Sequence, residues 1–320
     1  MNQIEIKVSV CCITYNHAPF LKKCLDGFLM QKVNFPIEIL IYDDASTDGA
    51  QEIIQTYANE HPKLIFPILQ TENQFSKGVR GINARFNYPR SRGKYIALCE
   101  GDDYWSDPLK LQKQVDYLDS NHNIVLVAHD SILVNQHGDI LQNTALEETQ
   151  KRDCTGLSLQ KCFGVLTQTM CFRNVQGIRN MPKESLLVSN GDKFLVSFLG
   201  QFGGYKYMND ILPSAYRLHQ GGIWSSISEL NRYKMMFVTY SNLRDYYSRM
   251  KNSSMAYFHG RKAFYYSNKS LKLKLSSNDQ LISKIASLIL FIKENRIFKN
   301  PYFFCKIIFT KMHKIVSRKN

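Results

Sequence analysis

Short apolar runs alternate with amphipathic segments along the first 130 residues. The runs are rich in Ile and Val and are typical of buried strands, whereas the segments between them repeat apolar residues at helical spacing. This alternation with short links predicts an α/β domain built on a mainly parallel sheet. The expected strands are Ile4–Thr14, Ile37–Tyr42, Leu64–Leu69, Tyr95–Cys99 and Ile124–Ala128, and the expected helices begin at Pro19 and cover Thr47–Glu60, Gly81–Tyr88 and Pro108–Ser120.

The pattern is less regular after residue 130. A hairpin is expected over Ser131–Gln142 and a strand over Leu166–Phe172. A helix is expected over Asn190–Leu199, with Ser189 or Asn190 as its N-cap. From Glu229 to Leu275 the spacing predicts helix, and the basic segment Leu281–Lys319 follows.

The positive charge is concentrated at one end of the chain. The 320 residues carry a net charge of +14. Hydrophobic residues make up 44% and charged residues 21%, which are ordinary values for a globular protein, so disorder is not the default expectation. Residues 221–320 hold 19 of the Lys and Arg and only four of the Asp and Glu. This tail predicts contact with an anionic surface, either membrane or nucleic acid, or else a solvated helical face.

Cysteine usage and the N-terminal segment indicate a reducing compartment. The eight cysteines show no CxxC spacing, which argues against a zinc knuckle, and several lie in apolar runs. Residues 1–7 form no apolar signal region, and no apolar run approaches the roughly 20 residues that cross a bilayer. We therefore expect a cytoplasmic protein that is not secreted.

Two acidic clusters follow expected strands. Ligands of open α/β sheets bind beyond the carboxyl ends of the strands. The cluster Glu100-Gly101-Asp102-Asp103 suits a hard divalent cation, or alternatively forms a solvated turn. In the cluster Asp43–Asp48, Ser46 or Thr47 is suited to cap the next helix, and a carboxylate is suited to accept from a nucleobase or a ribose hydroxyl.

Two later segments carry further candidate groups. Asp192 lies at an expected helix N-terminus, where it serves either as a first-turn acid or as a general base. Arg217 and His219 share one face of an extended segment and can both donate to phosphate, although a lone His is more often structural. Trp105 and Trp224 are candidates for stacking on sugar rings, although tryptophan more often belongs to the core or a pocket wall. Thr167-Gln168-Thr169 is a candidate for shaping a sugar or acceptor pocket.

Three motifs occur in a set order and carry a family resemblance. They are Val8–Asn16, Ile41–Asp48 and Gly93–Asp103. Together they resemble glycosyltransferase family 2, whose members have the GT-A fold, over about residues 6–225. The resemblance implies a Rossmann-like, mainly parallel sheet flanked by helices. It divides the chain into a catalytic domain, 1–225, with a nucleotide-binding half (about 1–130) and an acceptor half (about 131–225), followed by a helical basic region, 226–320.

The resemblance also implies roles for individual residues. Asp192 is the expected general base, and Asp103 and His219 are the expected ligands of Mn²⁺ or Mg²⁺. Many relatives have Asp where this chain has Glu100, and Glu where it has Gly191. The residues expected to bind the nucleotide sugar are Thr14, Tyr15, Asn16, Asp43, Asp44, Asp102, Arg217 and His219.

These roles combine into an inverting transfer reaction. The expected donor is a nucleotide-diphosphate sugar, with UDP as the nucleotide, and the expected acceptor is a glycan or lipid-linked hydroxyl in cell-surface polysaccharide biosynthesis. Residues 281–320 contain nine Lys and Arg among apolar residues at helical spacing. That pattern is typical of helices on an anionic membrane surface, here the inner face of the cell membrane, or of helices packed on the domain.

Two other functions agree less well with the sequence. A metal-dependent nucleotidyltransferase of the sugar-nucleotide pyrophosphorylase type carries a Gly-rich basic loop after its first strand. Here that position holds Thr14-Tyr15-Asn16-His17, without glycine. A basic nucleic-acid-binding protein would account for the tail, but the chain has no zinc-finger or RNP-like motif, so no nucleic-acid partner is expected.

Overall fold

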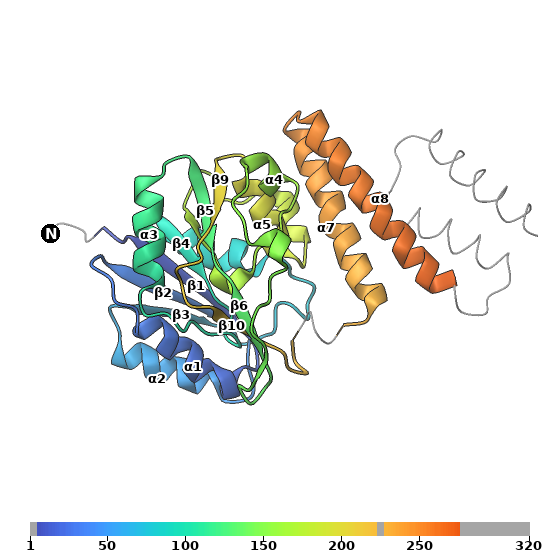
Figure 1. Ribbon diagram of the computed structural model, residues 1–320. Coiled ribbons are helices and arrows are strands. Elements are labelled where there is room, and N and C mark those ends of the chain that lie inside the picture. The colour runs from blue at the N-terminus through green and yellow to red at the C-terminus, as the bar shows by residue number, and fades with distance from the viewer. Residues whose placement is uncertain (1–4, 223–226, 276–320) are drawn as a thin grey trace, which may run out of the picture. The chain divides into compact units, whose positions relative to one another are not determined.

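A seven-stranded sheet forms the centre of the protein (Figure 1). The computed structural model describes residues 5–222 and 227–275. The strand order is β3-β2-β1-β4-β8-β5-β9, and only β8 runs antiparallel to its neighbours. The mainly parallel α/β sheet predicted from the sequence is therefore confirmed. Its strands are β1 (Val8–Thr14), β2 (Ile37–Asp43), β3 (Ile65–Leu69), β4 (Tyr95–Leu98), β5 (Ile124–Ala128), β8 (Cys171–Arg173) and β9 (Gly204–Tyr207).

Three helices cover this sheet and bury one apolar face each. They are α1 (Ala18–Leu29), α2 (Ala50–Glu60) and α3 (Lys110–Ser120). In Figure 1, α1 and α2 lie side by side against the sheet, and both contribute to one buried core with β1, β2 and β4. The loops that leave the carboxyl ends of these strands therefore start from a packed core.

Trp105 belongs to this core. Its side chain is 2% exposed, its ring lies 4.8 Å from that of Phe28, and its Nε1 donates to the Gln168 carbonyl at 2.7 Å. Of the two alternatives for Trp105, the core position is therefore confirmed, and stacking on a sugar is wrong because the ring is enclosed by protein. Trp224 lies outside the described residues.

The short helix expected around 81–88 is present as the π-helical turn η1 (Asn83–Asn87), followed by the 3₁₀ turn η2 (Tyr88–Arg90). The strand expected over 166–172 begins only at Cys171, after the 3₁₀ turn η4 (Thr167–Thr169). Gln114 Nε2 donates to the Thr169 carbonyl at 2.8 Å, so side chains satisfy groups that a strand would have paired.

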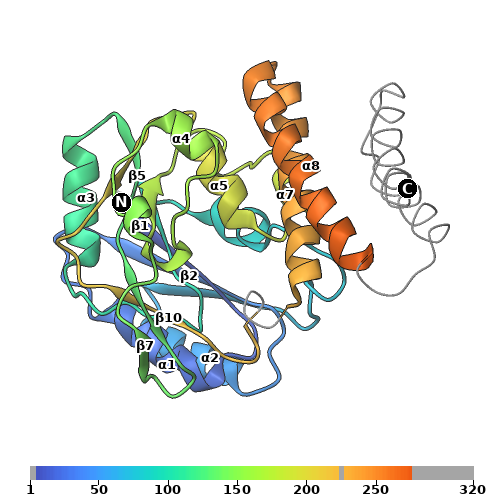
Figure 2. The same cartoon turned by 45° about the vertical axis from the view of Figure 1, so that its right-hand side comes forward.

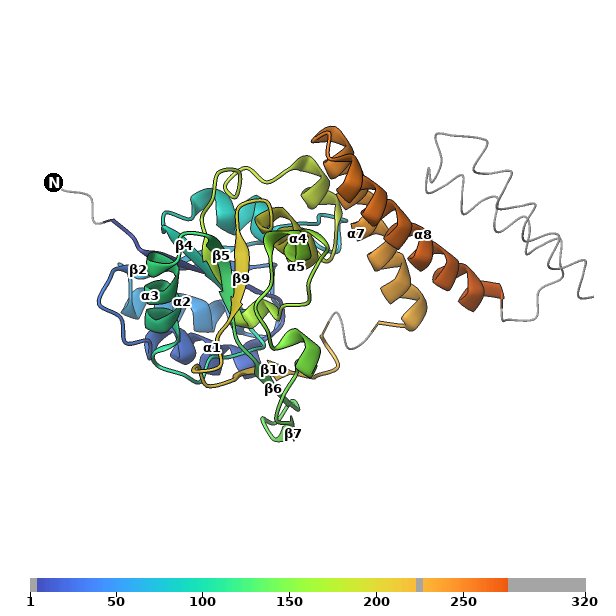
Figure 3. The ribbon, with the colours of Figure 1, turned by 45° about the horizontal axis from the view of Figure 1, so that its top comes forward.

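A second sheet is formed by β10 (Ser214–Arg217), β6 (Ser131–Val134) and β7 (Ile140–Gln142). The hairpin predicted over 131–142 is confirmed, because β6 and β7 pair antiparallel, as Figure 3 shows at the tip of the loop. β10 pairs in parallel with β6, and Tyr104 bridges to Ala215. This bridge holds the end of β10 against the loop that follows β4.

The remaining helices follow β5 in the chain. They are α4 (Gly156–Gln160), α5 (Gly191–Leu199), α7 (Glu229–Arg249), α8 (Ser253–Leu275) and the short turns η3 (Glu148–Gln150) and η5 (Lys183–Leu187). α7 runs beside α5 (Figure 2), and the Tyr247 hydroxyl donates to the Ser197 carbonyl at 2.9 Å. The helical prediction over 229–275 is confirmed except for a break at 250–252, where Lys251 has φ +59°.

The described residues up to Tyr266 form one compact unit, and residues 267–275 do not belong to it. The basic segment 281–320 lies outside the described residues. Among the helices that the structure describes, none combines the length and the apolar character required to cross a membrane.

Candidate functional site

The carboxyl ends of β1, β2 and β4 lie next to one another. Thr14 pairs with Asp43 in the register of β1 and β2, and β4 follows on the other side of β1. The loops beyond the strands are joined by backbone hydrogen bonds, from Asp44 N to the Thr14 carbonyl and from Gly101 N to the Ile13 carbonyl. Both acidic clusters of the sequence therefore meet at one edge of the sheet.

Asp43 organises the loop after β2. Its side chain is fully buried, and Oδ1 accepts from Ser46 N at 2.9 Å and from Gln51 Nε2 at 2.6 Å, while Oδ2 accepts from the Ser46 hydroxyl. The expectation that Ser46 or Thr47 caps α2 is wrong, because the N-cap is Gly49 at φ +97°. The Ser46 hydroxyl donates to the Asp43 carboxylate and does not cap the helix.

Asn16 and Asp48 tie the loop after β1 to the loop after β2. Asn16 adopts φ +54°, its N–H donates to Ser46 Oγ, and its Oδ1 accepts from Thr47 N. Asp48 accepts from Ala50 N at the start of α2 and from Ala18 N at the start of α1. One carboxylate thus satisfies the first turns of two helices, where negative charge is favoured.

Asp44 holds a third loop. It is 5% exposed; Oδ1 accepts from the Tyr42 hydroxyl and Gln74 N, and Oδ2 accepts from Phe75 N. Thr14 is buried nearby, whereas the Tyr15 side chain is 44% exposed. At this edge of the sheet, Tyr15 and Asn16 are thus the exposed members of the expected nucleotide-binding set, and the aspartates shape the surrounding loops.

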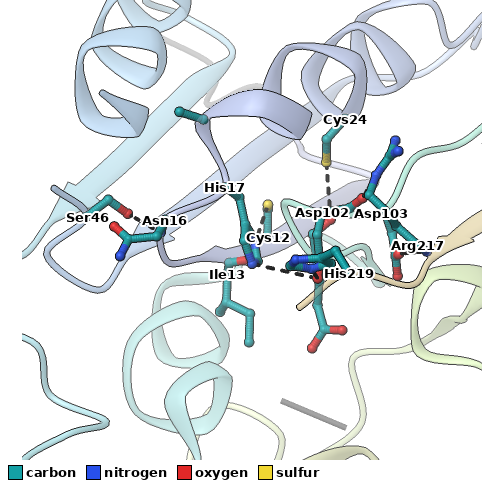
Figure 4. Close-up of polar contacts among 12 residues, drawn as sticks. Cys12, Ile13, Asn16, His17, Cys24, Ser46, Asp102, Asp103, Arg217 and His219 are labelled. Atoms are coloured by element: carbon teal, nitrogen blue, oxygen red, sulfur yellow. Dashed lines mark hydrogen bonds and ion pairs between the residues drawn. The ribbon is translucent and has the colours of Figure 1, made fainter. Parts of the chain in front are cut away.

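Asp102 lies between two histidines (Figure 4). Its Oδ2 is 3.0 Å from His219 Nε2 and 3.6 Å from His17 Nε2, and all three side chains are at most 15% exposed. Burial alone would raise the pKa of Asp102, but the hydrogen bond with His219 and the His17 ring hold it below the usual value. Burial lowers the pKa of His17 despite the neighbouring carboxylate.

Asp103 and Glu100 bring two further carboxylates close to Asp102. Asp103 is 1% exposed, and its Oδ1 accepts from Arg217 N at 2.8 Å. Burial, with the charges of Asp102 and Glu100, raises the pKa of Asp103. Burial, with the charges of Asp102 and Asp192, raises the pKa of Glu100 to about 8. The four carboxylates therefore form one strongly interacting acidic region, which a cation would stabilise.

Arg217 fixes the acidic segment to β10. Its Nε donates to the Asp102 carbonyl at 2.9 Å, and Nη1 donates to the carbonyls of Asn135 and Gln136. The guanidinium also lies 4.7 Å from the centre of the Phe20 ring. The structure thus places Arg217 beside the candidate diphosphate region, with most of its donors directed at backbone.

Asp192 is half-buried in the first turn of α5, and its charge acts on Glu100 and Tyr216. The structure therefore brings this acid toward the same region from a segment far along the chain. Asn190 occupies the N-cap position as expected, but makes no side-chain cap bond, and its Nδ2 donates to Met236 Sδ at 3.3 Å.

Sequence reasoning did not single out His17. It stands directly after the Thr14–Asn16 motif, and its role emerges only when the loops after β1 and β4 are seen together. The one signal in the sequence was its place at the carboxyl end of the first strand, three residues beyond Thr14.

The region fits a divalent cation in its chemistry. Within the described residues, two overlapping groups of ligand atoms lie within 4.8 Å of one another, namely His17, Asp102 and His219, and Glu100, Asp102 and Asp103. Asp102 Oδ1 and Asp103 Oδ2 are buried and find no hydrogen-bond partner among those residues. Unpartnered buried carboxylate oxygens are costly unless an ion or ligand satisfies them.

Comparison with known proteins identifies relatives of this chain. The model of the family described as Glycosyl transferase family 2 matches residues 9–175. An uncharacterized protein of Mycobacterium tuberculosis is 33% identical over 221 residues, which cover 68% of this chain and 61% of that relative. This chain therefore spans less than two thirds of the length of that relative.

Solved structures share the fold. The structure of S. aureus TarS 1–349 in complex with UDP-GlcNAc superposes with a TM-score of 0.54 at 18% identity, covering 74% of this chain and 66% of TarS. The mannosyltransferase PcManGT from Pyrobaculum calidifontis, in complex with GDP-Man and Mn²⁺, gives a TM-score of 0.54 at 14% identity, covering 92% of this chain and 87% of the other. The GT-A fold expected from the sequence motifs is confirmed by this similarity.

Proposed function

The chain belongs to glycosyl transferase family 2, and on that premise we propose that it transfers a sugar from a nucleotide-diphosphate sugar to an acceptor hydroxyl with inversion. One observation supports the proposal above all others. Asp102, with Asp103 and His219 close to it, lies at the edge of the sheet where the loops after β1 and β2 also begin. TarS binds UDP-GlcNAc and the mannosyltransferase binds GDP-Man. We propose a UDP-sugar as the donor.

The nucleoside is proposed to bind beside the ends of β1 and β2. Asp43 and Asp44 shape this pocket, since their oxygens hold the loops around Ser46 and Gln74. Asn16 joins the same loops, and Thr14 forms the floor. Tyr15 presents its exposed ring to the base or the ribose.

The diphosphate is proposed to bind beside Asp102, with Asp103 and His219 on either side. A divalent cation, Mn²⁺ or Mg²⁺, would neutralise the negative charge that appears on the leaving diphosphate. Arg217 keeps Asp102 and Asp103 at a fixed distance from β10 through its bonds to both. A site held this rigidly needs little reorganisation during the reaction.

Asp192 is proposed to act as the general base. It takes the proton of the acceptor hydroxyl while that oxygen attacks the anomeric carbon from the side opposite the diphosphate. The bond between this carbon and the phosphate oxygen breaks, and the nucleoside diphosphate leaves with the electron pair. A single displacement inverts the anomeric centre.

The acceptor is proposed to be a glycan or a lipid-linked sugar in cell-surface polysaccharide biosynthesis. In this proposal residues 1–225 carry the catalysis, and the basic region 226–320 brings the enzyme to the inner face of the membrane. The concentration of positive charge after residue 220 supports this arrangement.

Donor binding can be tested by thermal unfolding with UDP, GDP, ADP and CMP, each with and without Mn²⁺. We expect UDP with Mn²⁺ to raise the melting temperature, because a ligand at 100 times its Kd stabilises the native state by about 2.7 kcal/mol. Asp102→Asn should lose the Mn²⁺-dependent part of the shift, and Asp210→Asn, at an exposed position, should keep it. No shift with any nucleotide would contradict the donor site.

The role of Asp192 can be tested separately by measuring UDP release from UDP-sugars. Asp192→Asn should lower the rate about 10²- to 10⁴-fold, because the base that activates the attacking hydroxyl or water is lost. The thermal shift with UDP should stay unchanged in this variant. A variant that keeps the wild-type rate would show that another group removes the proton.

A further inference from the structure

Three side chains from distant segments direct one ligand atom each toward the same place. His17 precedes α1, Asp102 follows β4, and His219 follows β10 (Figure 4). The Nε2 atoms of the two histidines lie 3.6 Å and 3.0 Å from Asp102 Oδ2, and the three ligand atoms are within 4.8 Å of one another. The two rings meet edge to face, with centroids 5.7 Å apart.

This arrangement is a set of two imidazole nitrogens and one carboxylate. His17 Nε2 is too far from Asp102 for a hydrogen bond, although it faces the carboxylate, and the other oxygen of Asp102 finds no partner among the described residues. The loop that carries Asp102 is pressed close to His17, since a Cβ on Gly101 would lie 3.2 Å from His17 Nδ1. His219 also makes a direct hydrogen bond to Asp102 at 3.0 Å, whereas the 3.6 Å between His17 Nε2 and Asp102 Oδ2 suits a shared ion better than direct pairing.

We propose that His17, Asp102 and His219 hold the divalent cation of this enzyme, with His17 as a ligand, and that the site prefers transition-metal ions over Mg²⁺. This inference rests on the proposed glycosyl transfer and names the metal-binding residues within it. It assigns Asp103 to positioning the segment, in place of direct metal binding.

Accessibility favours this set over Glu100, Asp102 and Asp103. Asp103 is 1% exposed, and one of its oxygens accepts from Arg217 N at 2.8 Å. The side chains of His17, Asp102 and His219 are 14%, 15% and 7% exposed. The diphosphate of the donor enters the site from solvent. A cation that binds it therefore needs protein ligands that solvent can also reach.

The ligand types determine the metal preference. Mg²⁺ is bound through oxygen and keeps several of its waters, whereas imidazole suits first-row transition metals. Affinity for a site of this kind increases from Mn²⁺ to Co²⁺. We therefore expect affinities for the full chain in the order Mg²⁺, Mn²⁺, Co²⁺, with Mg²⁺ weakest.

The experiment is a titration of the full chain with Mn²⁺, followed by the EPR signal of free Mn²⁺, with pulsed EPR of the bound ion. The wild type should show ¹⁴N couplings from two imidazoles. His17→Gln should show the coupling of one imidazole and bind Mn²⁺ at least about tenfold more weakly. Affinity for Mg²⁺, measured by competition, should change less than affinity for Mn²⁺.

His122→Gln is the matched control, because His122 is exposed, and it should bind Mn²⁺ as the wild type does. Absence of ¹⁴N coupling in the wild type overturns the proposal without any variant, as does unchanged Mn²⁺ affinity in a folded His17→Gln. If His17→Gln does not fold, the wild-type couplings and the order of metal affinities decide.

The same samples separate this inference from the proposed function. Binding of UDP with Mn²⁺ in the absence of ¹⁴N coupling would refute the ligand set and leave the transfer reaction standing. Imidazole-bound Mn²⁺ in a chain that binds no nucleotide would refute the transfer reaction and leave the ligand set standing.

Discussion

At the scale of single residues, the candidate site depends on close approaches that few side chains permit. Gly101 shows this most clearly. A Cβ at this position would lie 2.6 Å from Thr14 Oγ1 and 2.7 Å from Thr14 Cβ. The loop after β4 can rest on the end of β1 only because residue 101 has no side chain, and Asp102 is placed beside His17 as a consequence.

Gly101→Ala should therefore destabilise the protein by about 1–3 kcal/mol, because the new methyl group forces the loop away from β1. Mn²⁺ binding should weaken as well, since Asp102 moves with the loop. Chemical denaturation and the Mn²⁺ titration measure the two effects.

Gly260→Ala is the control for this substitution. Gly260 lies inside α8, and a Cβ there would meet only the Arg244 side chain, at 3.5 Å or more. Alanine in a helix interior is favoured over glycine by about 0.5–1 kcal/mol, so this variant should gain stability. Equal loss in both variants would show that Gly101 has no special role.

At the scale of elements, α7 and α8 meet through a layer of stacked rings. His259 of α8 stacks on Tyr247 and Tyr240 of α7, with ring centroids 5.3 Å and 5.8 Å away. Its Nε2 lies 2.9 Å from the Gln160 carbonyl. Burial lowers the pKa of His259 to about 4, so the ring is neutral in the folded protein near pH 7.

This burial predicts sensitivity to acid. In the unfolded chain, His takes up a proton near pH 6.5, whereas His259 in the folded protein does so only near its pKa of about 4. The free energy of unfolding should therefore fall as the pH drops from about 6.5 to about 4, by up to about 3 kcal/mol from this group. Above pH 6.5 this group should contribute no pH dependence.

Denaturation curves between pH 4 and pH 7 measure this effect. His259→Gln should flatten the curve, because glutamine can donate to the Gln160 carbonyl and does not titrate. His122→Gln, at an exposed position, should leave the slope unchanged. If His259→Gln keeps the wild-type slope, the acid sensitivity arises elsewhere, for example at buried His129.

At the scale of the whole molecule, charge is divided unevenly along the chain. The net charge is +14, and residues 281–320 contribute nine Lys and Arg against the single acid Glu294. The interspersed apolar residues at helical spacing suit an anionic membrane surface. Each Lys or Arg near such a surface contributes about 1 kcal/mol.

Binding of the basic segment 281–320 to an anionic membrane can be tested by flotation with vesicles that contain anionic lipid. The full chain should float with them, and replacing Lys306, Lys311 and Lys314 by Gln should strongly reduce flotation. A control that replaces exposed Lys22, Lys63 and Lys183 by Gln removes the same charge from the folded unit and should float as the wild type does. Equal flotation of both variants would reject the tail as the membrane contact.

Much of the fold was readable from local pattern. Four of the five strands expected in the first 130 residues begin and end within one residue of the observed ones, and β5 matches at both ends. Period-two and period-3.6 apolar patterns reflect burial of one face, which local sequence specifies well. The 3₁₀ turn at Thr167–Thr169 was missed, because it depends on side chains of Trp105 and Gln114 that reach it from far away in sequence.

The sequence by itself determined the class of sheet, the placement of acids at strand ends and the candidates Asp102, Asp103, Asp192, Arg217 and His219. Only the tertiary structure decided which of these groups meet. It paired His17 and His219 with one oxygen of Asp102, directed most donors of Arg217 at backbone carbonyls, and enclosed Trp105 in the core. Such contacts join residues separated by 63 to 117 positions, so no local pattern encodes them. They follow from how the sheet orders its strands.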